Sequence, residues 1–366
     1  MTVVFVCVVG ARFLLPLLIP RFPLPAIIAC LVLDGVDQTI FQSFGYDPPG
    51  YQGYDKAMDV YYLAVAYLAT LRNWTSGPAF VVGRFLYFYR LVGVVAFELS
   101  HARPLLLVFP NTFEYFFIAY EAVRARWSPL RLLLSGWVLV AALIWVVVKL
   151  PQEYWIHIAK LDLTDLLADH PWAGLVVGIA LVAAVSAAWW VSRPRTPDPD
   201  WPWRWTADPL PEQIDEGHEV AAWHVEHGRV WSWPTLEKVA LVSLLSVVFA
   251  QTLPGVRSTD LELAVSTGVL VVVNASISLA ASRRSVSFES LAVAFGVRLL
   301  VNVGLVVLAS WLLGSASVNE GATVFFLFLL SLLTTMHDRW LPVREFRRAS
   351  GPGEAPGHVS SSGSPA

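Results

Sequence analysis

The sequence predicts an all-α polytopic membrane protein, a transmembrane helical bundle of about ten or eleven spans. Of the 366 residues, 56% are hydrophobic and only 14% are charged, whereas soluble domains carry about a quarter charged residues. Apolar runs of about 18–24 residues recur along the chain, the length that crosses ~30 Å of hydrocarbon. These runs lack the alternation of barrel strands, so we expect helices to be the spanning elements.

The spans are expected to form two modules separated by a long loop. Residues 1–192 make a polar-rich module with spans at 2–20, 24–42, 57–73, 78–98, 104–124, 131–150 and 172–192. Residues 236–342 make an apolar module with spans at 236–254, 261–281, 289–313 and 321–336. The loop 193–235 is rich in Trp and Pro, which favours an extended segment followed by a short amphipathic helix. Residues 343–366 are predicted to be a disordered cytoplasmic tail.

Arginine groups at alternate loops predict the orientation. Positive charge stays on the cytoplasmic side of short loops, so we expect the cell membrane as location, a cytoplasmic C-terminus and an external N-terminus. The groups are Arg124, Arg126 and Arg131; Arg193 and Arg195; Arg283 and Arg284; and Arg339, Arg344, Arg347 and Arg348.

Charge and cysteine content exclude some partners. A net charge of −3 without a basic face argues against nucleic acid, and two cysteines are too few for a thiolate metal cluster. Membrane lipid is the expected partner, and the loop 193–235 could dock a partner protein. Its histidines, His218, His224 and His227, match no specific zinc spacing.

Two acidic helix faces are the main candidate site. Asp34 and Asp37 lie at i and i+3 in one span, and Asp55 and Asp59 lie at i and i+4 in the next. A short loop joins the spans, so the faces should meet, near the outer leaflet. Four carboxylates repel one another unless a cation, a proton or Lys56 intervenes. These residues are therefore predicted metal ligands for a divalent cation, although helix-end carboxylates and interhelical hydrogen bonds are an equal alternative.

Later spans add polar residues that could complete this site. Ionisable groups in a span are costly, about 2.5–3.5 kcal/mol each, and so call for a partner or a role. Predicted catalytic residues are Asp55, Asp59, Glu153 and His157. Predicted substrate-binding residues are Arg90, Glu98, Asn111, Glu114 and Lys149, with Arg90 pairing with Glu98, Glu114 or Glu121 as the structural alternative. The stripe through Glu153 and His157 requires the helix to continue past Pro151.

Three resemblances accompany these residues. The segment with Asp34, Gly35 and Asp37 and the later DKAMD resemble the aspartate motif of CDP-alcohol phosphatidyltransferases, which implies two divalent metals, but the chain departs from it at Leu31, Gln38 and Thr39. Asp55 and Asp59 in a first external loop are similar to the acidic residues of polytopic glycosyltransferases that use polyprenyl-phosphate donors. The first 170 residues look most like uncharacterised integral membrane proteins of high-GC Gram-positive bacteria, which implies no activity.

The leading functional hypothesis is a membrane-embedded enzyme or binding protein that acts on a lipid or lipid-linked substrate at an outer-leaflet acidic pocket. A transporter, or an ion- or proton-coupled carrier, is the second class, with the buried carboxylates as a relay. A structural subunit or scaffold is the third.

Overall fold

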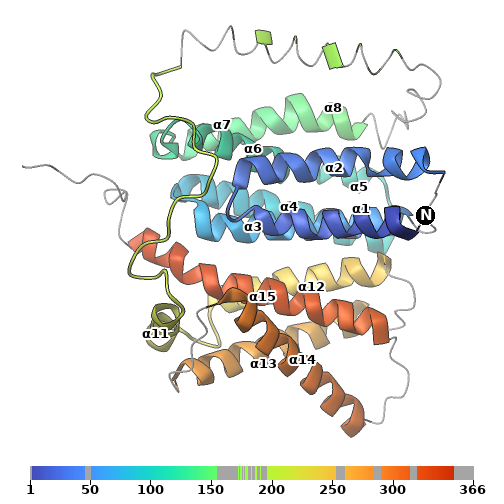
Figure 1. Ribbon diagram of the computed structural model, residues 1–366, viewed down its shortest axis with the longest axis vertical. Helices are drawn as coiled ribbons and strands as arrows, with labels where there is room; N and C mark the ends of the chain where they lie inside the picture. The colour runs from blue at the N-terminus through green and yellow to red at the C-terminus, as the bar shows by residue number, and fades with distance from the viewer. Residues whose placement is uncertain are drawn as a thin grey trace, which may run out of the picture.

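The fold is all-α, as the sequence predicts. The computed structural model describes residues 2–45, 51–154, 196–252, 260–283, 290–313 and 320–349, with isolated positions between 172 and 190. Every regular element in these ranges is a helix (Figure 1). Four of the helical stretches are long and apolar enough to cross a membrane: Pro23–Ser43, Gly77–Ser100, Leu134–Glu153 and Trp233–Gln251. The expected span at 172–192 lies mostly outside the described residues.

The N-terminal module is built around one buried helix. It contains α1 (Thr2–Leu14) with the 3-10 turn η1 (Leu15–Leu18), α2 (Pro23–Ser43), α3 (Tyr51–Asn73), α4 (Gly77–Ser100), α5 (Pro104–Val108) and α6 (Thr112–Arg124). Almost every described side chain of α3 from residue 57 to 71 is buried. This helix contacts α1, α2 and α4 on one side and α12 and α15 of the next module on the other. Its apolar surface on all sides therefore places it at the centre of the bundle.

The span expected at 104–124 is broken, which corrects the prediction of one continuous helix. The helix α5 ends at Val108 and α6 begins at Thr112. Pro110 explains the break, because proline lacks an N–H donor and disfavours helical backbone in the residue before it. Phe109 of the break packs against Gly93 of α4, where an added Cβ would lie 2.1 Å from the Phe109 Cβ. Only glycine allows this approach.

The next span crosses Pro151 without ending. After a 3-10 turn, η2 (Pro129–Arg131), the helix runs through α7 (Leu134–Leu143), a π-helical turn η3 (Ile144–Lys149) and α8 (Leu150–Glu153). A π turn changes the backbone hydrogen-bond register and so accommodates the proline that follows it. Glu153 is therefore helical, as its predicted role required, whereas His157 lies outside the described residues.

The C-terminal module comprises α12 (Trp233–Thr252), α13 (Asp260–Arg283), α14 (Leu291–Leu313) and α15 (Glu320–Ala349). The helix α15 continues seven residues into the range predicted to be a disordered tail. Val343 is fully buried there and packs with Ile214 and Val220. This apolar contact accounts for the extra helical turns.

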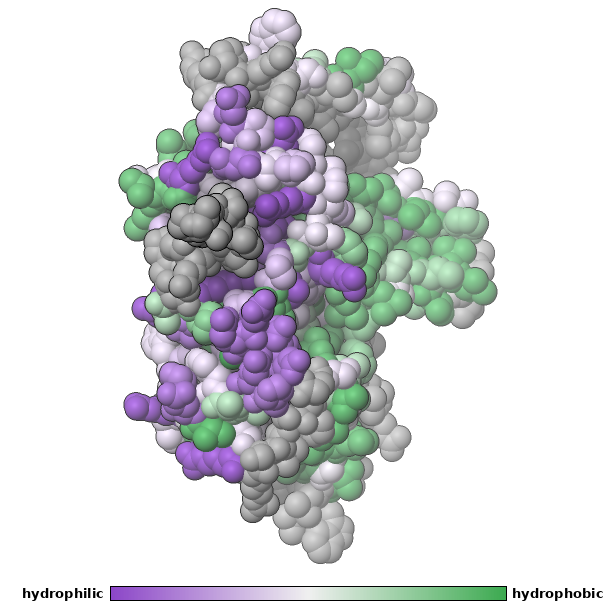
Figure 2. All heavy atoms as spheres, turned by 60° about the vertical axis from the view of Figure 1, so that its left-hand side comes forward, coloured by the Kyte–Doolittle hydropathy of each residue, from purple (hydrophilic) through white to green (hydrophobic). Residues whose placement is uncertain are grey.

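Between the modules, the loop forms a strap over residues 196–214 and the short helix α11 (Gly217–His227). The strap runs along the helix ends on the left of Figure 1. The Asp200 amide donates to the Arg126 carbonyl at 3.0 Å, and the Ala207 amide donates to the Arg21 carbonyl at 2.8 Å. Figure 2 shows hydrophilic side chains gathered on this face and hydrophobic ones beside it, as expected for the end of a membrane bundle.

The strap also reaches the C-terminal helix. Arg347 donates to the Pro209 carbonyl of the strap at 3.3 Å. Arg339 donates at 3.0 Å to the carbonyl of Glu216, the N-cap residue of α11. The strap therefore ties the N-terminal helix ends to α15. Docking of a partner protein on the loop 193–235 stays a prediction.

Candidate functional site

The four predicted carboxylates converge, but they do so around an arginine. Arg12 of α1 lies between α2 and α3, and its Nη1 is 2.5 Å from Asp37 Oδ2 and 2.6 Å from Asp55 Oδ1. Its Nη2 pairs with Asp34 and lies 3.5 Å from Asp59 Oδ1. Arg12 and Asp37 are buried, whereas the other three carboxylates are about a quarter to a third exposed. A guanidinium has five N–H donors, so it can serve all four.

The predicted metal site at these carboxylates stays a prediction, but an arginine lies where the ion was expected. The guanidinium of Arg12 occupies the space between the carboxylates that a divalent cation was expected to fill. Among the described residues, no three or more His, Cys, Asp or Glu side chains are placed to hold a metal ion. Lys56 does not enter the cluster either, because its Nζ lies 3.2 Å from Glu98 Oε1 and 4.5 Å from the centre of the Phe97 ring.

A second polar cluster joins α3, α6 and α8 at the helix break. Tyr62 donates to Glu114 Oε1, and Asn111 Nδ2 donates to Glu114 Oε2 at 2.9 Å. The backbone N–H of Asn111 donates to Glu153 Oε1 at 3.4 Å. Lys149 is 3% exposed. Among the described residues its Nζ lies 3.0 Å from Gln152 Oε1 and 4.1 Å from the centre of the Tyr115 ring, both neutral groups. The structure therefore brings Asn111, Glu114 and Glu153 together, while the predicted roles of these residues and of Lys149 stay predictions.

Arg90 has a different partner from those expected. Its Nη1 donates to the Phe109 carbonyl at 2.9 Å, which satisfies a backbone acceptor freed by the helix break. Among the described residues it forms no ion pair within 4.0 Å with Glu98, Glu114 or Glu121. Glu121 instead bonds to Arg124 at 2.6 Å and to Trp74 at 3.0 Å. The Arg90 side chain thus connects α4 to the non-helical segment between α5 and α6.

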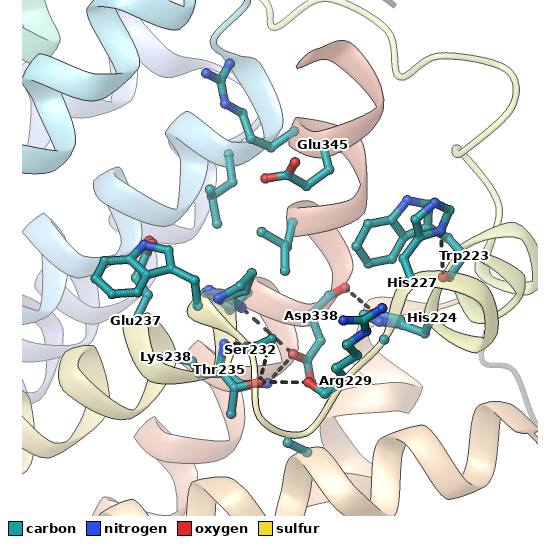
Figure 3. A pocket seen from close by; sticks show the side chains of 18 of the residues that line it. Trp223, His224, His227, Arg229, Ser232, Thr235, Glu237, Lys238, Asp338 and Glu345 are labelled. Carbon is teal, nitrogen blue, oxygen red and sulfur yellow. Dashed lines mark hydrogen bonds and ion pairs between the residues drawn. The ribbon is translucent and has the colours of Figure 1, made fainter. Parts of the chain in front are cut away.

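A cavity lies apart from both polar clusters, between α4, α11, α12, α13 and α15. It has a volume of about 400 Å³, within the range of small-molecule pockets. Figure 3 shows side chains from α11, α12 and α15 converging on it. Sequence reasoning assigned this pocket no role. Its lining combines the consecutive helices α11, α12 and α13 with the distant helices α4 and α15, so no local pattern marks it.

Asp338 organises one wall of this pocket. Its Oδ1 lies 2.5 Å from Lys238 Nζ and its Oδ2 lies 2.7 Å from Arg298 Nη2, while its carbonyl accepts a bond from His224 Nε2 at 3.0 Å. Because a carbonyl only accepts, Nε2 of His224 carries a proton. Burial lowers the pKa of His224 below its usual value, against the opposing effect of Asp338. Arg298 of α14 thereby joins this cluster from a fourth helix.

The pocket lining is cationic on one side and apolar on another. Five Arg or Lys and three acidic side chains line it, and each acidic side chain already pairs with a cation. Arg229 is exposed, and the N-terminus of α12 opens into the pocket, with Ser232 Oγ accepting from the Thr235 amide at 3.4 Å. Phe80, Leu279, Leu341 and Trp233 supply the apolar surface.

His337 is the least satisfied group in the pocket lining. Its side chain is 1% exposed, and neither ring nitrogen has a hydrogen-bond partner. Its Nδ1 lies 3.9 Å from Asp338 Oδ1, beyond hydrogen-bond distance. A buried polar group without a partner is costly, so the pocket lining contains two ring nitrogens that a ligand could engage.

Comparison with known proteins adds no functional assignment: no family model, curated protein or solved structure matches the chain.

Proposed function

We propose that the protein is an integral protein of the cell membrane with an external N-terminus and a cytoplasmic C-terminus. Support comes from the strap, which gathers Arg21, Arg124, Arg126 and Arg347 at one end of the bundle. Positive charge at one end is the usual mark of the cytoplasmic side.

Sidedness can be tested with single cysteines in a Cys7→Ser/Cys30→Ser background. Arg204→Cys lies in the strap and Arg103→Cys lies in the exposed turn between α4 and α5. An impermeant maleimide should label Arg103→Cys in intact cells and Arg204→Cys only after lysis. The reverse pattern would invert the orientation.

We further propose that the protein binds the anionic headgroup of a lipid or lipid-linked ligand in the α11–α15 pocket. The observation that carries this is the lining itself, in which surplus cations, a helix N-terminus and an apolar wall meet in one 400 Å³ cavity. Helix N-termini and Arg side chains bind phosphate oxygens. The adjoining apolar wall suits an acyl or prenyl chain.

This proposal moves the ligand site away from the acidic cluster. The carboxylates there surround Arg12 and would repel an anionic headgroup. In the proposed orientation, the pocket lies at the cytoplasmic end, where anionic lipids are concentrated. The lipid or lipid-linked ligand class is retained, and its predicted site is replaced.

Thermal unfolding of the purified full chain in detergent tests the proposal. Phosphatidic acid should raise the Tm, while a diacylglycerol with the same chains should not, because it lacks the phosphate. Inorganic phosphate alone should raise the Tm if the headgroup is sufficient for binding, and should leave it unchanged if the lipid chains are also required. Equal shifts with phosphatidic acid and diacylglycerol would rule out headgroup recognition.

Two variants and a control locate the site. Arg229→Gln should reduce the phosphatidic acid shift, since one cation near an anionic lipid contributes about 1 kcal/mol. His337→Phe keeps an aromatic ring but removes both ring nitrogens, and should also weaken binding. Arg103→Gln removes an exposed arginine outside the pocket and should change nothing. If all three variants respond like the wild type, the pocket is not the site.

A further inference from the structure

A small cavity between α3 and α4 adjoins the Arg12 cluster. It has a volume of about 20 Å³ and is lined by Asp59, Tyr87 and Arg90 together with apolar side chains of both helices. One water molecule needs at least about 10–15 Å³. The cavity is therefore large enough for one water and too small for a substrate.

Three polar atoms around this cavity lack partners. The Tyr87 hydroxyl, the Arg90 Nε and the Asp59 Oδ1 are all buried, and none makes a hydrogen bond. Tyr87 is only 2% exposed. Arg12 lies 3.5 Å from this oxygen of Asp59 and does not hydrogen-bond to it. Buried polar groups almost always have a protein or water partner, so three such atoms around one cavity call for an occupant.

The chemistry of these three groups selects that occupant. Arg90 Nε–H is a donor, Asp59 Oδ1 is an acceptor and the Tyr87 hydroxyl can be either. A water molecule satisfies this combination, because it accepts and donates at once. A metal cation does not, because the guanidinium of Arg90 would repel it.

We propose that this cavity binds one ordered water molecule, which accepts a hydrogen bond from Arg90 Nε, donates one to Asp59 Oδ1 and takes the Tyr87 hydroxyl as its third partner. The site is independent of the lipid pocket. Arg90 also donates to the Phe109 carbonyl at 2.9 Å. The water therefore connects the Arg12 cluster on α1, α2 and α3 to the helix break before α6.

This connection ties α3 to α4. Asp59 and Arg90 lie on different helices, and among the described residues no direct hydrogen bond joins them. The water links them by hydrogen bonds but gives a proton no path beyond Asp59, because the guanidinium of Arg90 stays protonated and cannot accept one. The contact therefore does not support the second functional class, a proton or cation relay.

Paired tyrosine variants test whether the cavity is wet. Tyr61 is also fully buried, and its hydroxyl donates to the Phe13 carbonyl at 3.1 Å. If the water is present, Tyr87→Phe breaks a real hydrogen bond and should lower the Tm in detergent, as Tyr61→Phe does. If the cavity is dry, Tyr87→Phe removes an unsatisfied hydroxyl and should leave the Tm unchanged or raise it, which would overturn the proposal.

A direct observation settles the case if the variants fail to fold. A density map of the full chain that resolves ordered water should show a peak within hydrogen-bond distance of Arg90 Nε and Asp59 Oδ1. An empty cavity in such a map would also overturn the proposal.

Discussion

Two of the charged clusters among the described residues have opposite arrangements of charge. In the N-terminal module, one arginine, Arg12, lies among four aspartates. In the C-terminal module, one aspartate, Asp338, lies between Lys238 and Arg298, with His224 on its carbonyl. Each cluster joins helices that are distant in sequence. The first presents surplus negative charge and the second surplus positive charge.

The difference in the space around the clusters is as informative as the difference in charge. Arg12 fills the gap between its carboxylates, and the cavity beside them holds about one water. Asp338 stands at the wall of a cavity twenty times larger. Charge in the first region therefore holds helices together, whereas the lining of the second includes cations beyond those that its acidic side chains pair with. Under our proposal these cations bind an anion.

The largest effect is expected from Arg12→Leu. It leaves four carboxylates without their shared cation, and breaking a buried ion pair by removing one partner costs about 3–5 kcal/mol. Thermal unfolding in detergent should show a large fall in Tm or no folded protein. Arg12→Lys keeps the charge but cannot serve four acceptors. Its Tm should therefore lie between the Tm of the wild type and that of Arg12→Leu.

A double variant shows whether the loss is electrostatic. Asp37→Asn on the Arg12→Leu background removes the most buried of the four carboxylates and should recover part of the Tm. If Arg12→Leu alone unfolds at the wild-type temperature, the cluster is not what holds α1, α2 and α3 together.

A smaller effect is expected at the helix break, which is particular to the N-terminal region. In Gly93→Ala the new methyl group would meet the Phe109 Cβ at 2.1 Å, so the backbone of the break must move. Overpacking of this kind costs about 1–3 kcal/mol. Gly296 of α14 has nothing within 4 Å of an added Cβ, and Gly296→Ala should instead raise stability slightly. Equal shifts in the two variants would mean that the Phe109 contact is not tight.

The sequence predicted the helices and the polar positions well, for a physical reason. Charged residues inside apolar runs stand out because burial in a membrane is costly. Helical spacing then places residues on common faces, and Asn111 and Glu114, three residues apart, do bond to each other. The break at Phe109 is also marked in the sequence by Pro110, although the hydropathy of the run 104–124 concealed it.

The identity of the partners was not predictable in the same way. Whether Asp34 faces a metal ion, a proton or Arg12 depends on the depth and rotation of α1, which no spacing within α2 or α3 reveals. The pocket was still harder to predict from the sequence, because His224 and Asp338 are 114 residues apart. Arg12 within the first apolar run and Asp338 just after the last were the available signals.

The smallest of the three effects is expected at His224, and it should depend on pH. His224 lies on α11 outside the spans, and burial lowers its pKa in the folded protein below the unfolded value of about 6.5. Between the two pKa values the unfolded chain binds more protons, so acid favours unfolding. The stabilising contribution of neutral His224 is therefore present above about pH 6.5 and is lost as the pH falls through the folded pKa.

His224→Gln keeps a donor for the Asp338 carbonyl but cannot titrate, so its Tm should fall less than that of the wild type between neutral and acidic pH. His218→Gln, an exposed position on the same helix, controls for the loss of an imidazole. A wild-type Tm that falls no faster than that of His224→Gln would show that the contact between α11 and Asp338 is not the pH-sensitive part of the pocket.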